Sequence, residues 1–134
     1  MPLQCINPDG IPTPQTYSHV VVSKGSRLVF IAGQVAEDPH GNLVGRGDMV
    51  AQATQVFANI GLALAAAGAR PDQVTKLTIF VADYKRDYLS QIEEGRISLF
   101  GMHKPTDTLV GVAALSHADY MLEVDAIAVV DDDA

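Results

Sequence analysis

Two kinds of apolar pattern alternate along the chain: short runs bounded by turn residues, and longer segments in which apolar residues recur every three or four positions. The first kind predicts β-strands and the second predicts amphipathic helices. Residues 20–22 begin the series as a strand, and residues 24–26 have turn composition. Residues 27–34 are therefore expected to return antiparallel to the first strand as the second half of a hairpin.

The first helical segment is predicted to begin after Asp48, because an Asp side chain can accept hydrogen bonds from the free N–H groups of a first turn. Gly68 can adopt the conformation that follows a last turn, and Pro71 prevents the helix from resuming. Gly61 lies inside this helix at a cost of about 1 kcal/mol relative to Ala, and we attribute it to close approach of the helix to a sheet. The inward stripe is predicted to consist of Val50, Ala53, Phe57, Ile60 and Leu64.

A strand over residues 74–81 separates this helix from a second one, which Asp87 is expected to cap and Gly101 to end. Residues 108–115 and 121–130 predict two further strands. The order β-β-α-β-α-β-β indicates an α/β (α+β) fold, in which right-handed crossovers place both helices on one face of a mixed sheet. The second helix should turn Leu89, Ile92, Leu99 and Phe100 toward that sheet.

Both faces of the predicted sheet are apolar. On the last strand, Val124 and Ala126 point to one face, and Ile127 and Val129 point to the other. Two helices cover one face, so the second face needs another partner, and the simplest partner is a copy of the same chain. We therefore expect obligate self-association.

The composition fits a single domain over residues 1–134, with 48% apolar and 19% charged residues. The formal charge is −7 and the nine Lys and Arg residues form no basic run, which argues against nucleic acid as a partner. We expect no membrane span, because the apolar runs are too short, and no signal peptide, because residues 1–4 lack its layout. Cys5 is the only cysteine, so no internal disulfide can form. Together these features favour the cytoplasm.

Several motifs carry a resemblance to a known family. Residues 101–115 read GMHKPTDTLVGVAAL, and the last strand contains EVDAIAV at residues 123–129. With FIAGQV at residues 30–35 and the strand over residues 74–83, they resemble the Rid/YjgF family. Its members are the reactive intermediate deaminases, also labelled L-PSP endoribonucleases, and the similarity covers nearly the whole chain in the family's order.

The resemblance implies a chorismate-mutase-like fold and a homotrimeric barrel with helices outside and small-molecule clefts between subunits. The implied activity is hydrolysis of enamines and imines to a keto acid and ammonia, with no metal and no organic cofactor. A homotrimer agrees with the uncovered apolar face, which the strand pattern predicts without the resemblance.

Three residues match positions of the family's site. Tyr17 matches a Tyr before the first strand whose phenol can hydrogen-bond a ligand, and Gly33 matches a glycine that lets backbone line the pocket. Glu123 matches the acid on the last strand, whose implied role is to orient or deprotonate the attacking water. Each also has an ordinary structural interpretation: an amphipathic side chain at a strand entrance, a β-bulge, and a solvated strand end.

Asp107 departs from the family pattern. Active members read Pro-Ala-Arg-Thr or Pro-Ser-Arg-Thr, and that Arg binds the substrate carboxylate; this chain reads Pro-Thr-Asp-Thr. An Arg donates from a planar fork, whereas an Asp only accepts hydrogen bonds and repels a carboxylate. Leu109 stands where the family has a Cys. Lys104, Arg96 and His103 are the nearby residues that could supply a replacement cation, and Lys104 could swing toward a cleft.

Three functions remain open at this point. The first is a divergent deaminase or other hydrolase in which Glu123 is the base, Tyr17 orients the substrate, and Asp107 selects a substrate that lacks a carboxylate or carries an amine. The second is a non-catalytic trimer that binds a small molecule. The third, a ribonuclease, rests on the family's older label, and the acidic charge argues against it. No metal is expected, because the spacing of His19, His40 and His117 does not suit a metal site.

Overall fold

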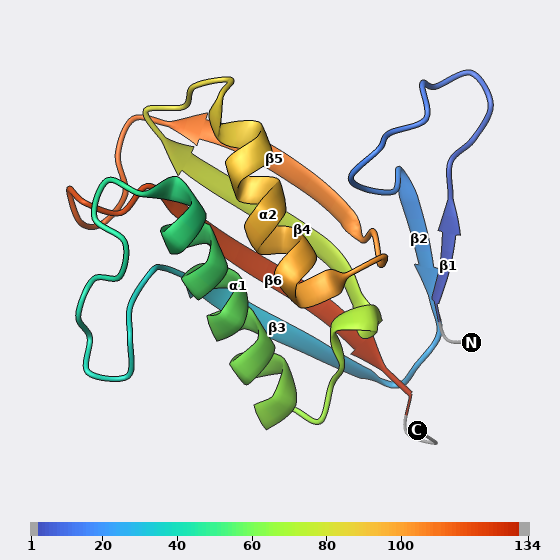
Figure 1. Cartoon of the computed structure of the whole chain (residues 1–134). Coiled ribbons are helices and arrows are strands. Elements are labelled where there is room, and N and C mark those ends of the chain that lie inside the picture. Colours follow the sequence, from blue (N-terminus) through green and yellow to red (C-terminus); the bar gives the residue numbers. More distant parts are fainter. Residues whose placement is uncertain (1–2, 132–134) are drawn as a thin grey trace.

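The core of the protein is a four-stranded mixed sheet covered on one face by two helices (Figure 1). The computed structural model describes residues 3–131; residues 1–2 and 132–134 lie outside this description. The sheet contains β3 (Arg27–Gln34), β6 (Leu122–Val130), β4 (Val74–Ala82) and β5 (Thr106–Val112), in that spatial order. Strands β4 and β5 are parallel, whereas β6 is antiparallel to both β3 and β4.

Helices α1 (Met49–Ala66) and α2 (Tyr88–Phe100) lie on the same face of this sheet (Figure 1), and a short 3-10 helix, η1 (Pro71–Gln73), precedes β4. The expected α+β architecture is therefore confirmed. Strand β5 begins two residues before and ends three residues before the predicted range of 108–115.

The N-terminal strands are arranged differently from the predicted hairpin. Strand β2 (Val20–Ser23) does not pair with β3; it pairs antiparallel with β1 (Leu3–Ile6), a strand that the sequence pattern did not predict. The two form a separate sheet, which stands beyond the end of the main sheet (Figure 1). The prediction is wrong because residues 24–26 permit a tight turn without requiring one.

Helix α1 begins and ends as predicted. The Asp48 carboxylate accepts a hydrogen bond from the N–H of Ala51 at 3.1 Å, and Gly68, with φ of +73°, follows the last turn. By length and a mean hydropathy of 1.4 the helix could cross a membrane, but one side of it packs on the sheet. Val50 is only half-buried, contrary to the prediction, and the buried side consists of Met49, Gln52, Ala53, Val56, Phe57, Ile60 and Leu64.

Glycines allow close contact between the two helices. A Cβ at Gly95 would lie 2.7 Å from the backbone carbon of Ala53, and a Cβ at Gly61 would lie 2.9 Å from a methyl of Leu99. The attribution of Gly61 to a helix–sheet approach is therefore wrong, because it faces α2. Only glycine permits this spacing without repacking of the neighbours.

Helix α2 follows the predicted pattern only in part. Ile92 and Phe100 are buried as expected, but Leu89 is 48% exposed. Asp87 occupies the N-cap position without making a side-chain capping hydrogen bond. Arg96 also lies on the inward side of α2, where it is buried at 3% exposure. A charged residue is therefore buried on the face of α2 that the pattern predicts to be apolar.

The sheet face opposite the helices is uncovered, as the strand pattern predicts. On β6, the residues from Leu122 to Val130 alternate between buried and half-buried. On β3, Leu28 and Phe30 project from the open face with 62% and 70% of their surface exposed. A face with exposed apolar side chains of this size is typical of a protein–protein contact.

Candidate functional site

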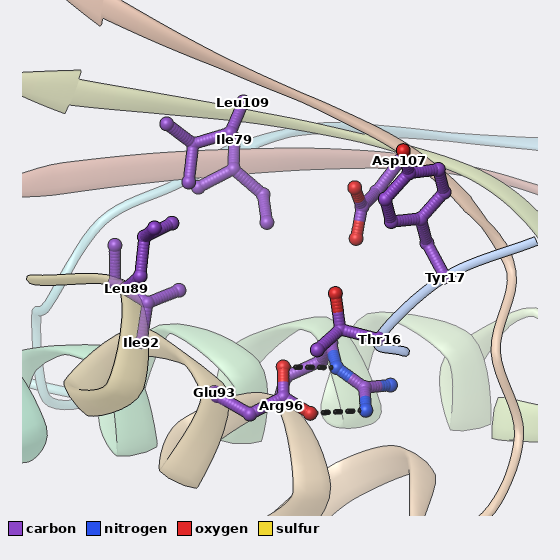
Figure 2. A pocket seen from close by; sticks show the side chains of 9 residues that line it. All are labelled: Thr16, Tyr17, Ile79, Leu89, Ile92, Glu93, Arg96, Asp107 and Leu109. Carbon is purple, nitrogen blue, oxygen red and sulfur yellow. Dashed lines mark hydrogen bonds and ion pairs between the residues drawn. The ribbon is translucent and has the colours of Figure 1, made fainter. Parts of the chain in front are cut away.

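A cavity of about 300 Å³ lies between α2 and strands β4 and β5 (Figure 2). Its apolar wall consists of Ile79, Leu89, Ile92 and Leu109. Its polar residues are Thr16, Tyr17, Glu93, Arg96 and Asp107. Figure 2 shows Asp107 and Tyr17 close together on one side of the cavity, across from the apolar side chains. Pockets with an apolar wall and a few convergent polar groups are typical small-molecule sites.

The register of β4 and β5 explains why Asp107 points into this cavity. Leu77 pairs with Asp107, and Ile79 pairs with Leu109. Directly paired residues share a face of the sheet, and Leu77 is fully buried beneath the helices. Asp107 and Leu109 therefore face α2, where Tyr17 joins them from the segment before β2 (Figure 2).

Arg96 also lies in the cavity, but its guanidinium is already engaged (Figure 2). Its Nε donates to the Glu93 carboxylate at 2.8 Å, its Nη2 donates to the other oxygen of that carboxylate, and its Nη1 donates to the carbonyl of His103 at 3.1 Å. Of the other candidate cations, Lys104 is exposed and outside the cavity lining, and His103 contacts the carbonyl of Val74 at 2.8 Å. None of the three presents a free cationic group where the family has its Arg.

The Asp107 carboxylate makes no hydrogen bond or ion pair with the residues that the structure describes. Burial raises the pKa of this carboxyl to about 6, a change that Arg96 opposes and Glu93 reinforces. Glu93, Arg96 and Asp107 together carry two negative charges and one positive charge, a formal sum of −1. The cavity therefore favours a cationic or neutral guest and disfavours a carboxylate.

The raised pKa predicts how stability depends on pH. Because the pKa of Asp107 is about 6 in the folded chain against 3.8 for a free Asp, ionisation of Asp107 costs folding free energy. This cost is absent below pH 3.8, grows between pH 3.8 and 6, and is complete above pH 6. Asp107→Asn removes it. From pH 4 to pH 7, the free energy of unfolding of the wild type should fall by about 1–2 kcal/mol relative to the variant, less than the whole shift implies because solvent screens a partly exposed group.

Urea unfolding of both proteins at several pH values measures this difference directly. The Asn variant serves as the neutral control of nearly identical shape. A difference that stays constant between pH 4 and pH 7 would show that the Asp107 carboxyl is not perturbed by its surroundings.

Gly33 and Glu123 meet at a different place. A Cβ at Gly33 would lie 2.7 Å from the Cδ atom of Glu123, so the absence of a side chain leaves room for this carboxylate. The pairing of β3 with β6 is irregular between Ile31 and Gln34, as the β-bulge interpretation of Gly33 predicts. The structure thus places the predicted base against the predicted glycine.

The two groups lie on opposite faces of the sheet. Across β4, Glu123 is in register with Phe80, whereas Asp107 is in register with Leu77. An odd separation of three residues along one strand reverses the face. A single copy of the chain therefore brings Tyr17, Asp107 and Leu109 together but keeps Glu123 apart from them.

Sequence reasoning did not predict Glu93 and Thr16 as site residues. The spacing of Glu93 and Arg96 is visible in the sequence and indicates an ion pair on α2, but it does not show that the pair faces a cavity. Within residues 3–131, His, Cys, Asp and Glu side chains do not gather in a group of three that could hold a metal ion.

Comparison with known proteins identifies the family. The family model described as Endoribonuclease L-PSP matches residues 9–130. The chain belongs to the Rid family. Among Rid relatives, Protein HMF1 of Saccharomyces cerevisiae is 35% identical over 84% of this chain and 83% of its own length. The 2-iminobutanoate/2-iminopropanoate deaminase of Mus musculus is 34% identical over 77% of this chain and 74% of its own length. The 3-aminoacrylate deaminase RutC of Acinetobacter baylyi is 29% identical over 87% of this chain and 99% of its own length.

Solved Rid structures confirm the fold. The Rid protein YyfB of Yersinia pestis has a TM-score of 0.90 at 34% identity, covering 97% of this chain and 100% of its own. A putative endoribonuclease of Thermotoga maritima has a TM-score of 0.71 at 31% identity, covering 96% and 98%. RidA of an Antarctic Psychrobacter has a TM-score of 0.70 at 30% identity, covering 95% and 99%.

Proposed function

We propose that this chain is a Rid-type deaminase that hydrolyses an imine or enamine to a carbonyl compound and ammonia. The observation that carries the proposal is the Glu123 carboxylate, which lies against Gly33 and makes no hydrogen bond or ion pair with residues 3–131, so that it can act as a base toward a water molecule. Two relatives are named as deaminases of imines or of aminoacrylate. The proposal extends that chemistry to this chain.

The complete site is proposed to form between copies of the chain in a homotrimer. The cavity with Tyr17 and Asp107 faces α2, whereas Glu123 lies on the uncovered face of the sheet. Only a second copy can bring a Glu123 to the cavity of the first. The exposed Leu28 and Phe30 give that open face an apolar surface to bury against a partner.

The chemistry requires a base, a water and an oriented imine. Glu123 accepts a proton from water as the water oxygen bonds to the imine carbon, and the C=N bond becomes a C–N single bond whose nitrogen gains a proton. This nitrogen proton is the one that Glu123 took from water. Glu123 then accepts the hydroxyl proton of the resulting carbinolamine as the C=O bond forms and passes it to the departing nitrogen, so that the C–N bond breaks with release of ammonia and the carboxylate is restored. Tyr17 can hydrogen-bond the substrate during both steps, and water is the only co-reactant.

The charge of the cavity sets the substrate class. With Asp107 in place of the family's Arg, and with Arg96 engaged by Glu93, a substrate carboxylate would meet a net negative charge. We propose an imine or enamine that lacks a carboxylate or carries an ammonium group. The apolar wall and the Tyr17 ring suit a short aliphatic chain, and an ammonium can also interact with the ring face.

The alternative is a trimer that binds such an amine without turnover. It is favoured by the position of Glu123, which does not line the cavity within one chain. The formal charge of −7 opposes a ribonuclease role. The single cysteine is free, which suits a reducing compartment, and we propose the cytoplasm.

Two imines that differ in one group test the proposal. One is 2-iminopropanoate, and the other is an aliphatic imine of similar length with an ammonium in place of the carboxylate. We expect the ratio of kcat/KM to favour the second imine by at least about tenfold, since about one pK unit of differential interaction corresponds to that factor. The ratio should rise further, by up to about tenfold, from pH 5 to pH 7, because the pKa of Asp107 is about 6 and the ionised carboxylate attracts the ammonium.

Ammonia release above the spontaneous rate is the measurement. A preference for 2-iminopropanoate would contradict the proposed substrate class while leaving deamination intact. Acceleration of neither imine, with binding of the matching saturated diamine detected by calorimetry, would overturn the deaminase and support the binding alternative.

A further inference from the structure

The N-terminal strands are held to the rest of the chain at the start of β5. The Ser18 hydroxyl donates to the carbonyl of Lys104 at 2.6 Å, and the N–H of Ser18 donates to the carbonyl of Pro105 at 3.2 Å. The Cys5 thiol lies 3.9 Å from the same Lys104 carbonyl. Ser18 is 3% exposed, so this anchor is buried. The β1–β2 pair beyond it has no strand pairing with the main sheet.

The edge of the main sheet at β3 is open. Among the described strands, β3 pairs only with β6, so its outer N–H and C=O groups have no strand beside them. Leu28 and Phe30 on this strand are the strongly exposed apolar residues noted above. Natural proteins rarely leave such an edge uncovered, because an unpaired strand recruits another.

The exposed residues of β2 match those of β3. A hairpin with residues 24–26 as its loop would place Val22 opposite Leu28 and Val20 opposite Phe30. The same pairs form if β2 pairs antiparallel, in this register, with the β3 strand of another copy. Val20 and Val22 are 40% and 46% exposed in the structure. Cross-strand pairs of apolar, β-branched or aromatic residues of this kind stabilise antiparallel sheets. The two surfaces are therefore complementary in sequence although they do not meet within one chain.

One chain cannot satisfy both sets of contacts. Strands β3, β4 and β5 run in the same direction, with β3 and β5 at opposite edges of the sheet. Pro105 precedes β5, whereas the hairpin register would place residues 17–18 beside the far end of β3. These two places are about 19 Å apart across the sheet, which is four strand spacings, and about 10 Å apart along it, from the usual strand spacing and rise. The anchor at Ser18 therefore excludes pairing of β2 with its own β3.

We propose that the β1–β2 pair of one copy completes the sheet of the next copy by pairing with its β3 strand. In the same register, Tyr17 of the first copy lies opposite Gly33 of the partner subunit, which contacts the partner subunit's Glu123. The exchanged segment thus brings the cavity lined by Tyr17 and Asp107 next to the partner subunit's Glu123, the base that the cavity lacks within one chain. Exchange of an identical element between copies is a low-cost route to oligomers.

The structural comparisons support a distinct placement of this segment. YyfB, the Thermotoga protein and the Psychrobacter RidA have nearly equal identity and coverage, yet their TM-scores are 0.90, 0.71 and 0.70. A segment placed differently relative to the rest of the chain lowers this score without lowering the sequence identity. The exchange is therefore a feature that we expect YyfB to share and the other two to lack.

Disulfide cross-linking of the full-length chain tests the exchange. In a Cys5→Ser background, Val22→Cys with Leu28→Cys places two thiols opposite each other in the proposed register. Both native side chains are exposed, so neither substitution removes core packing. Directly opposite residues of antiparallel strands alternate between hydrogen-bonded and non-hydrogen-bonded pairs, which differ in Cα separation and so in how readily a disulfide forms. A second variant, Val21→Cys with Val29→Cys, therefore tests the neighbouring pair, which belongs to the other class. After mild oxidation we expect most of at least one variant to migrate as covalent oligomers in denaturing, non-reducing gels.

The matched control is Leu28→Cys with Val129→Cys, which pairs β3 with β6 inside one chain and should give only a cross-linked monomer. An internal disulfide in both test variants would overturn the exchange in favour of a closed hairpin. Absence of any cross-link in both, while the control pair forms, would equally overturn it, because β2 would then not lie beside a β3 strand. Neither outcome depends on deaminase activity.

Discussion

Replacing Glu123 with Gln is expected to lower kcat for the better imine by about 10²–10⁴-fold, the usual contribution of a positioned general base. Glutamine has nearly the same shape as glutamate and fits the space beside Gly33, but its amide cannot accept a proton from water at neutral pH. Binding of the substrate should change far less than turnover. Single-turnover measurement of ammonia release separates the two effects.

Asp125→Asn is the matched control for this substitution. Asp125 lies two residues from Glu123 on the same strand and the same face, and the change removes the same charge. We expect it to retain activity within about threefold, the size of a minor electrostatic effect. Equal losses in both variants would indicate a general effect of charge on the open face. Full activity of Glu123→Gln would remove Glu123 from the mechanism.

Asp107→Arg is expected to reverse the substrate preference. It changes the formal charge of the cavity from −1 to +1 and supplies the planar donor fork that pairs with a carboxylate. At about 4 Å and an effective dielectric near 20, each interaction amounts to about 4 kcal/mol before screening. We therefore expect the ratio of kcat/KM for 2-iminopropanoate over the ammonium-bearing imine to rise by about 10²–10³-fold, which corresponds to roughly 3–4 kcal/mol.

Glu94→Arg controls for overall charge. Glu94 is exposed on α2 and does not line the cavity, so the substitution makes the same charge change outside the site. We expect it to leave the ratio nearly unchanged. If Asp107→Arg also leaves it unchanged, the side chain at this position does not contact the substrate, and the charge of the cavity does not determine specificity.

The sequence predicts the helices and most of the main sheet because their apolar periodicity is strong. The cap at Asp48 and the end at Gly68 follow from local hydrogen bonding and backbone conformation, which depend on few neighbours. The open apolar face follows from strict alternation along β6. These features depend on residues close in sequence.

The N-terminal region could not be predicted in the same way. Whether residues 24–26 close a hairpin depends on the buried anchor of Ser18 at Lys104 and Pro105, a contact between segments 86 residues apart. The role of Gly61 likewise depends on Leu99 of the other helix. Such features need the tertiary structure.

The site was predictable as a set of residues but not as an arrangement. The family pattern assigns Tyr17, Gly33 and Glu123, and it identifies Asp107 as a departure from the usual Arg. The register of β4 with its two neighbours then decides that Asp107 and Glu123 lie on opposite faces. The sequence also shows Arg96 as a possible replacement cation, whereas the structure shows that Glu93 engages it.

The separation of Asp107 and Glu123 on opposite faces has a genetic consequence. If each site takes Glu123 from one copy of the chain and Asp107 from another, a substitution at either position removes only one of these two groups from each site. Two defective alleles, one altered at each position, then restore some intact sites when they are expressed in the same cell. A cell that expresses both defective alleles would therefore have more deaminase activity than a cell that expresses either allele alone.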